Sequence, residues 1–172
     1  PSGEYALSVS VDKAAEEGNL FYVDIEKSGY TSKQTSVNAV AERTATAGTN
    51  VLKAIDAKVT SIGTAGGTHT SSAGDVKVII PAGALKQTKN IRTTLFQQSK
   101  ELPGKLPSTS FFTYAGQWTA DEEDTTFETP VTVHIANTLG FKAGTKIPIG
   151  YYNEETRAWE DSGQMATVDS TG

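Results

Sequence analysis

The chain has 172 residues with 37% hydrophobic content, which is enough for a packed core and excludes an intrinsically disordered protein. Its net charge of -5, from 15 Lys and Arg against 20 Asp and Glu, argues against a nucleic-acid-binding surface. No apolar run approaches the ~18 residues of a membrane span, and the absence of cysteine excludes disulfides and thiolate chemistry.

Composition also bears on where the protein works. Thr, Ser, Gly and Ala are abundant and helix-type Lys–Glu composition is scarce, which favours a secreted or cell-surface protein. The chain shows no signal peptide and opens on Pro1-Ser2-Gly3, so we expect a processed or partial product.

The first predicted element is a strand over residues 5–11, "YALSVSV". Tyr5, Leu7, Val9 and Val11 share one face, and small or polar residues share the other. This period of two is typical of a half-buried strand. A polar loop ending in the turn pair Gly18-Asn19 follows.

Two more strands are predicted in the N-terminal part. Residues 20–27, "LFYVDIEK", alternate with Phe21, Val23 and Ile25 facing inward, and Ser28-Gly29 forms a turn. Residues 31–40, "TSKQTSVNAV", are polar and Thr-rich, as in an outer or edge strand. Residues 41–50 have almost no hydrophobic signal and indicate a linker or a long loop.

These N-terminal stretches resemble the later half of a carboxypeptidase-regulatory-like (transthyretin-like) domain. That family reads Asp-x-x-Gly-x-Tyr-x-Leu-x-Val, then a strand ending in Lys-x-Gly-Tyr, then a Thr-rich strand. The matching residues are Gly3, Tyr5, Leu7, Val9, Lys27, Gly29 and Tyr30. The resemblance implies a partial β module over residues 1–45, because the opening strands of the family pattern are missing here.

The middle of the chain is harder to assign. Residues 51–62 fit both helical and strand spacing, and the β-rich surroundings favour a strand. Residues 63–74, "GTAGGTHTSSAG", predict a loop, since they lack the lysine and following helix of a phosphate-binding loop. His69 falls in this loop and His134 in a later strand, so we expect both at solvent or on a sheet face rather than on zinc.

The stretch "DVKVIIPAGALKQ" predicts a strand that ends in a corner. Val76, Val78 and Ile80 alternate with Lys77 and Ile79. Pro81 lacks the N–H that would continue the ladder, and Gly83 permits a backbone conformation that other residues resist. Ala84 and Leu85 can then fold back beneath the sheet. A structural corner is therefore favoured over a catalytic site.

Further strands follow at intervals of roughly 8 to 15 residues, with turn signals between them. They are expected at residues 91–97, 110–118, 130–137, 147–153 and 158–163, and residues 165–172 look like the start of one more. The predicted fold is all-β, with antiparallel β-sandwich modules, two in number, and little helix.

The second half is similar to the ZU5-like β-sandwich modules of bacterial surface proteins. The stretches that carry this resemblance are "VKVIIPAGAL", "TPVTVHIAN" and "IPIGYYNEETRAW". It implies a second module over residues 46–172, in which the Ile-Pro-x-Gly-Ala corner is structural. Some modules of this kind cleave themselves at His-Phe-Ser, but here Ile135 follows His134, so no autoproteolytic residue is carried over.

The acidic run Asp121, Glu122, Glu123 and Asp124 is a candidate calcium site, because clustered carboxylates supply the hard oxygen ligands that calcium takes. The run lacks the Asp-x-Asn/Asp-x-Asp-Gly spacing of a calcium loop. A solvated acidic turn is the favoured interpretation, and calcium is the alternative. No other cofactor is expected.

The aromatic residues near the C-terminus also have two interpretations. Residues 153–157 predict a turn that lets Tyr151 or Tyr152 face Trp159 across a hairpin, which is the favoured one. The alternative is a sugar-binding platform made of Trp118, Tyr151 and Trp159.

No acid/base pair or partnered nucleophile can be named, so the sequence predicts a protein that is not an enzyme. We expect a structural or adhesive module of a prokaryotic cell surface. Incomplete modules have three explanations: the missing strands lie upstream in a longer protein, the three N-terminal strands close onto the second sandwich, or a neighbouring subunit supplies a strand. The third explanation predicts a homo-oligomer by edge-strand pairing, including a filament joined by strand complementation, with "QTSVNAV" as a partner edge. The alternative is a carbohydrate- or calcium-binding accessory module.

Overall fold

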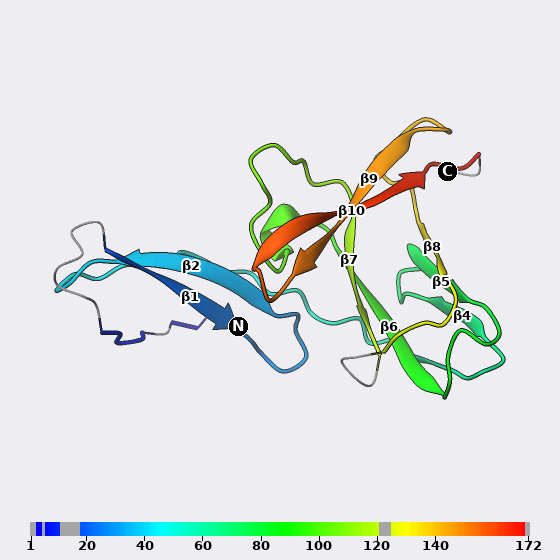
Figure 1. Cartoon of the computed structure of the whole chain (residues 1–172), viewed down its shortest axis with the longest axis horizontal. Helices are drawn as coiled ribbons and strands as arrows, with labels where there is room; N and C mark the ends of the chain where they lie inside the picture. The colour runs from blue at the N-terminus through cyan, green and yellow to red at the C-terminus, as the bar shows by residue number, and fades with distance from the viewer. Residues whose placement is uncertain (1–2, 5, 11–17, 121–124, 171–172) are drawn as a thin grey trace.

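The computed structural model describes residues 3–4, 6–10, 18–120 and 125–170, and this part of the chain is almost entirely β (Figure 1). Its elements are β1 (Asn19–Ile25), β2 (Lys33–Ala39), β3 (Thr60–Ile62), β4 (Gly67–Thr70), β5 (Val76–Ile80), β6 (Lys89–Phe96), the 3-10 turn η1 (Ser99–Glu101), β7 (Ala115–Thr119), β8 (Thr132–Ile135), β9 (Lys146–Asn153) and β10 (Ala158–Thr167). The prediction of an all-β fold with little helix is confirmed.

The strands form four small antiparallel sheets. Two have three strands, in the orders β3-β6-β7 and β4-β5-β8, and two are the hairpins β1-β2 and β10-β9. In Figure 1 the molecule is elongated, with the β1–β2 hairpin at one end and the β4-β5-β8 sheet at the other. Among the described residues, each of these small sheets has two outer edges.

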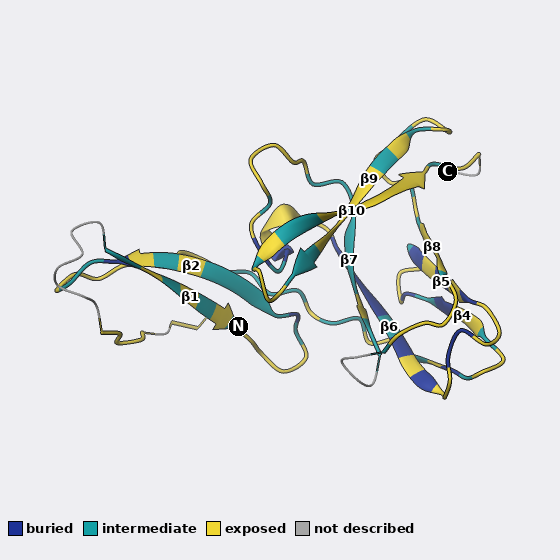
Figure 2. Cartoon of the chain, in the orientation of Figure 1, coloured by how far each residue is buried: buried dark blue, intermediate teal, exposed yellow. Residues whose placement is uncertain are grey.

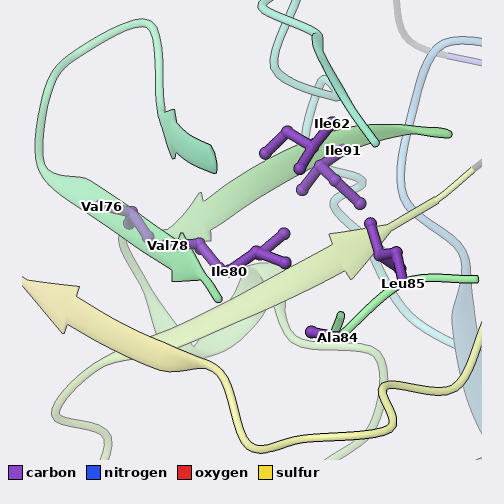
Figure 3. Close-up of a cluster of buried hydrophobic side chains, with 7 residues drawn as sticks. All are labelled: Ile62, Val76, Val78, Ile80, Ala84, Leu85 and Ile91. Atoms are coloured by element: carbon purple, nitrogen blue, oxygen red, sulfur yellow. The ribbon is translucent and has the colours of Figure 1, made fainter. Parts of the chain in front are cut away.

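The hydrophobic core lies between the two three-stranded sheets. Its buried side chains come from β3, β5, β6 and the corner after β5, and they are Ile62, Val76, Val78, Ile80, Ala84, Leu85 and Ile91 (Figure 3). Burying a side chain such as Val or Ile stabilises the fold by about 1.5–3 kcal/mol. This packing of two sheets is the sandwich arrangement that the strand spacing predicts.

The stretch after β5 turns sharply. The strand ends at Ile80, and Gly83 has a φ of +78°. The Gly83 amide donates to the Thr64 carbonyl at 2.8 Å, while Ala84 and Leu85 are buried in the core. The chain thus folds back under the sheet directly behind Pro81.

The β1–β2 hairpin is connected to the rest of the molecule through backbone bonds and through side chains. Tyr30 forms an isolated bridge with Ala54, and the Thr31 amide donates to the Lys53 carbonyl at 2.8 Å. The Gln34 amide donates to the Pro103 carbonyl at 2.7 Å. Figure 2 shows far fewer buried residues along this hairpin than along β4, β5 and β6. The hairpin is therefore held at its root.

Several strand predictions are wrong in detail. Residues 6–10 form no strand, and Tyr5 and Val11 lie outside the described residues. Only residues 60–62 of the 51–62 segment are a strand, and residues 110–114 come before β7. Here tertiary packing, and not local alternation, decides which extended residues find a partner.

The predicted loop at residues 63–74 is also wrong, because it contains β4. His69 is fully buried there, with 0% of its surface exposed. Its Nδ1 lies 2.8 Å from the Thr60 hydroxyl and its Nε2 lies 3.2 Å from the Thr93 hydroxyl. A polar side chain can be buried at this position because both ring nitrogens find partners.

The last two predicted strands are a single strand. β10 runs through the stretch "DSGQ", where the register against β9 shifts between Asp161 and Gln164. Gly163 has a φ of +69°. The Ser-Gly pair that looks like a turn is therefore a bulge within one strand.

Candidate functional site

A groove of about 650 Å³ lies among β7, β8, β9 and β10. Three continuous runs supply most of its wall, at residues 113–118, 133–135 and 147–152, and Trp159 and Val168 add to it from the last strand and its end. Most of these side chains are apolar or aromatic. The groove is therefore suited to an apolar ligand or segment rather than to an ion.

The groove follows the edges of strands. Successive side chains of a strand point to opposite faces, so a run of consecutive residues can line one groove only where the groove runs along the strand's edge. β7 and β8 are outer strands of their sheets, and β9 pairs with β10 alone among the described strands. Three strand edges thus border the same apolar space.

The three aromatic residues predicted as a sugar platform all line this groove. Trp118 comes from β7, Tyr151 from β9 and Trp159 from β10. The structure adds Tyr152, whose ring centroid lies 5.5 Å from that of Trp159 at an interplanar angle of 58°. Tyr152 and Trp159 are direct cross-strand partners, so the aromatic pair across the hairpin is formed by Tyr152.

Tyr152 and Trp159 are fixed by their polar ends. The Trp159 Nε1–H donates to the Gly104 carbonyl at 3.1 Å, and the Tyr152 hydroxyl donates to Gln34 Oε1 at 2.8 Å. Burial raises the pKa of Tyr152. The loop at Gly104 lies so close that an added Cβ would clash with the Tyr152 ring, at 2.6 Å from its Cζ. These two rings are wall elements in fixed orientations.

Trp118 is held differently. Its ring lies over Gly116, where a Cβ would come within 2.6 Å of Cζ3, and 40% of the residue is exposed. The two residues are two positions apart on one strand and share a face. Gly116 therefore provides the space in which the Trp118 ring lies along the groove.

Tyr151 is part of a polar cluster on the hairpin. Its hydroxyl donates to Glu160 Oε2 at 2.6 Å, and Glu160 also accepts from the Thr156 hydroxyl and the Asn153 amide. The hydrogen bond from Tyr151 lowers the pKa of Glu160, and the same contact raises the pKa of Tyr151. At neutral pH Glu160 stays ionised and Tyr151 stays protonated, so the pair braces the hairpin.

Metal binding finds no support in the described part of the chain. Asp121, Glu122, Glu123 and Asp124 lie outside the described residues. Elsewhere in the described ranges, no group of three or more His, Cys, Asp or Glu side chains is close enough to hold a metal ion. His134 lies on β8 at the groove and is exposed.

The apolar wall from β8 and β9 is what the sequence analysis misses, notably Val133, Ile147 and Ile149. One signal for it is present. Pro148 lies inside a strand, and a proline within a strand is typical of an edge because it cannot donate to a ladder. The run "IPIGYY" therefore indicates an apolar edge strand.

No protein-family model, curated protein or solved structure matches this chain. The transthyretin-like and ZU5-like resemblances stay predictions, as does the division at residue 45. No helix in the described ranges is long and apolar enough to cross a membrane.

Proposed function

We propose that the protein is a non-enzymatic structural or adhesive β-sandwich module of a prokaryotic cell surface. In this proposal it works by pairing its open strand edges with other protein subunits. The observation that carries the proposal is the amount of surface that the folded chain leaves exposed.

The solvent-accessible surface is 11724 Å² for a chain of 18.2 kDa. A compact monomer of this mass exposes about 8,100 Å², so the excess is about 3,600 Å². A standard protein interface removes about 800 Å² from each partner. The excess is thus large enough for more than one interface on each subunit.

The exposed surface includes apolar side chains on outer strands. Leu20, Tyr22, Val133, Ile149 and Met165 are large hydrophobic residues that remain exposed on β1, β8, β9 and β10. Two-stranded sheets are marginal on their own, and uncovered apolar edges are sites where proteins pair with further strands. A subunit interface on these strands would extend the two-stranded sheets and cover the apolar edges.

The edge predicted for pairing, residues 34–40, covers most of β2 and is only partly open. Its Gln34 amide is already bonded to the Pro103 carbonyl, and Ala39 near its other end is buried. The edges along the groove carry no such bond in the described residues. They are therefore the better candidates for contact with another subunit.

A non-enzymatic role is favoured by the chemistry of the groove. Tyr151 lines the groove, and its hydroxyl is bonded to Glu160 on the same hairpin; the pKa of Tyr151 is raised and that of Glu160 is lowered. Their shifts move both titrations away from neutral pH. General acid–base catalysis needs a group whose pKa is near the working pH, and this pair offers none.

Sedimentation and electron microscopy of the purified chain test the proposal. We expect species heavier than 18.2 kDa whose share grows with concentration, and chains of subunits on the grid. Lysines at Val133 and Ile149 should abolish assembly, because edge charges block strand pairing, while Ile79→Lys on the central strand β5 should not. A purely monomeric chain at all concentrations would refute the proposal, and surface labelling of intact cells tests the location.

A carbohydrate-binding module is the second candidate, because Trp118, Tyr151 and Trp159 line one groove. Aromatic faces bind the apolar faces of sugar rings. A glycan array followed by calorimetry tests this function. Trp118→Ala should then abolish binding while the protein remains monomeric.

A further inference from the structure

We propose that the groove bordered by β7, β8 and β9 accepts an extended strand from a second copy of this chain, and that residues 6–10 supply that strand. This inference rests on the proposed function and names the two surfaces that it uses.

The acceptor has the geometry of a missing strand position. An outer strand directs every second backbone N–H and C=O away from its one partner. β7 and β8 belong to different sheets, and each presents such an edge to the groove. Between these edges the groove walls are apolar, with Trp118, Val133 and Ile149 among them. An added strand would find backbone partners at its edge and apolar contacts for its side chains.

The donor has the matching sequence. Leu7 and Val9 are 70% and 50% exposed, and they lie on the same side of an extended segment. The segment "ALSVS" carries no charge and forms no strand with any described residue. Five extended residues span about 17 Å, and β7 is also five residues long. The segment can therefore run along the full length of that edge.

The donor and the acceptor lie at different parts of the elongated molecule. In Figure 1 the N-terminal residues, drawn in blue, lie toward the β1–β2 end, while β8 lies at the opposite end. Donor and acceptor surfaces that differ make a head-to-tail contact, which builds an open chain of subunits or, where the rotation between subunits closes, a ring.

The exposed area accommodates this arrangement. Each subunit in such a chain uses one donor and one acceptor surface, which removes about 1,600 Å² from it at standard interface size. The exposed surface of 11724 Å² exceeds that of a compact monomer by about twice this amount.

Disulfide trapping tests the contact, and the chain suits it because it has no native cysteine. Val9→Cys and Val133→Cys are made in separate chains, one of them labelled with ¹⁵N, and are mixed under mild oxidation. A disulfide forms only when the two Cα atoms approach to within about 7 Å. We expect the 9–133 cross-link between labelled and unlabelled chains, identified by mass spectrometry.

The matched control uses Ile79→Cys instead of Val133→Cys as the partner of Val9→Cys. Both residues are 36% exposed and lie in the same sheet, but Ile79 is outside the groove. The 9–133 pair should cross-link about tenfold faster than the 9–79 pair, because binding raises the local concentration of only one pair. Equal rates in a protein that does assemble would overturn this inference and leave the proposed function standing.

Two further outcomes separate the alternatives. The first is a double variant, Val9→Cys with Val133→Cys, in one chain. If it forms the disulfide within a monomer while the single variants do not cross-link, the chain fills its own groove. Absence of both assembly and cross-linking would overturn the inference and the proposed function together.

A peptide experiment needs no variant of the protein. A synthetic peptide of residues 3–11 should dissociate the assembly and change the tryptophan fluorescence, since both tryptophans line the groove. The same peptide with Asp at positions 7 and 9 should do neither. If both peptides act alike, or neither acts on a protein that assembles, this donor segment is wrong.

Discussion

At the residue scale, His69 is the side chain whose environment has the clearest consequence. It joins β4 to the facing sheet through Thr60 and Thr93, and it is fully buried. Burial lowers its pKa, nearby Lys58 lowers it further, and Asp56 partly offsets both. The folded protein therefore holds His69 neutral at a pH where an unfolded chain would protonate it.

This environment predicts a pH dependence of stability. The ordinary histidine pKa is about 6.5, so below that pH the unfolded state binds a proton that the folded state does not. The free energy of unfolding should fall as pH falls from about 7 until the lowered pKa is passed, with one proton limiting the slope to about 1.4 kcal/mol per pH unit. Urea denaturation between pH 7.5 and 5 measures it.

Two glutamine variants provide the control. His69→Gln should flatten the slope between pH 7 and 5, whatever it costs in stability at pH 7. His134→Gln, at an exposed position on β8, should leave the slope unchanged. A slope that persists in His69→Gln would assign the dependence to other groups.

Two glycines near the corner after β5 should differ in how much stability is lost when each is replaced by alanine. Gly66 and Gly83 both have positive φ, at +75° and +78°, but an added Cβ at Gly66 would meet Pro81 C at 2.6 Å and one at Gly83 would meet nothing within 4 Å. Gly83→Ala should cost about 1–2 kcal/mol for the backbone conformation alone. Gly66→Ala should cost about 3 kcal/mol or more, because the backbone must also move.

Urea denaturation of both glycine variants at pH 7 compares these costs. Equal losses of stability would mean that the close approach of Gly66 to Pro81 is relieved without cost.

At the element scale, the β9–β10 hairpin depends on one of its two adjacent tyrosines. Tyr152 packs on Trp159 and bonds to Gln34, whereas Tyr151 is 49% exposed and its hydroxyl bonds to Glu160 on the same hairpin. Tyr152→Ala should lower the free energy of unfolding by about 2 kcal/mol, and Tyr151→Ala by no more than about 0.5 kcal/mol.

Tyr152→Phe keeps the ring contact and removes the hydroxyl bond to Gln34. This variant should therefore lower the free energy of unfolding by about 1 kcal/mol. Thermal and urea denaturation of the three variants measure these differences. If Tyr151→Ala costs as much as Tyr152→Ala, the ring pair does not determine the stability of the hairpin.

The sequence predicts elements well where the alternation of side chains is unbroken. β5 is such a case, since Val76, Val78 and Ile80 are buried and Lys77 and Ile79 are exposed. β4 could not be predicted, because its Gly and Thr residues hide the period and only His69 points into the core. The sequence predicts two strands where β10 is one, because a bulge and a turn share the same Ser-Gly signal.

At the scale of the whole molecule, the groove could not be predicted as a site. Trp118, Tyr151 and Trp159 are identifiable as candidates in the sequence, but their meeting depends on the order of strands in separate sheets. No local pattern contains that order. The apolar wall at Val133 and Ile149 likewise resembles ordinary strand residues until the edges are known.

The two predicted modules touch at several points across residue 45. Arg157 lies 3.4 Å from Asp24 and its guanidinium lies 4.5 Å from the centre of the Tyr22 ring. The backbone bonds of Thr31 and Gln34 cross the same boundary. These contacts fix one end of the β1–β2 hairpin and leave the groove edges of β7, β8 and β9 unaffected.

The most direct test of strand pairing is amide hydrogen exchange in the assembled and dissociated protein. Every second amide of β7 and β8 should exchange more slowly in the assembled state, because an added strand would bond the outward-facing groups. Amides of the central strand β5 should be equally protected in both states. Equal exchange at the β7 and β8 edges in both states would contradict the account.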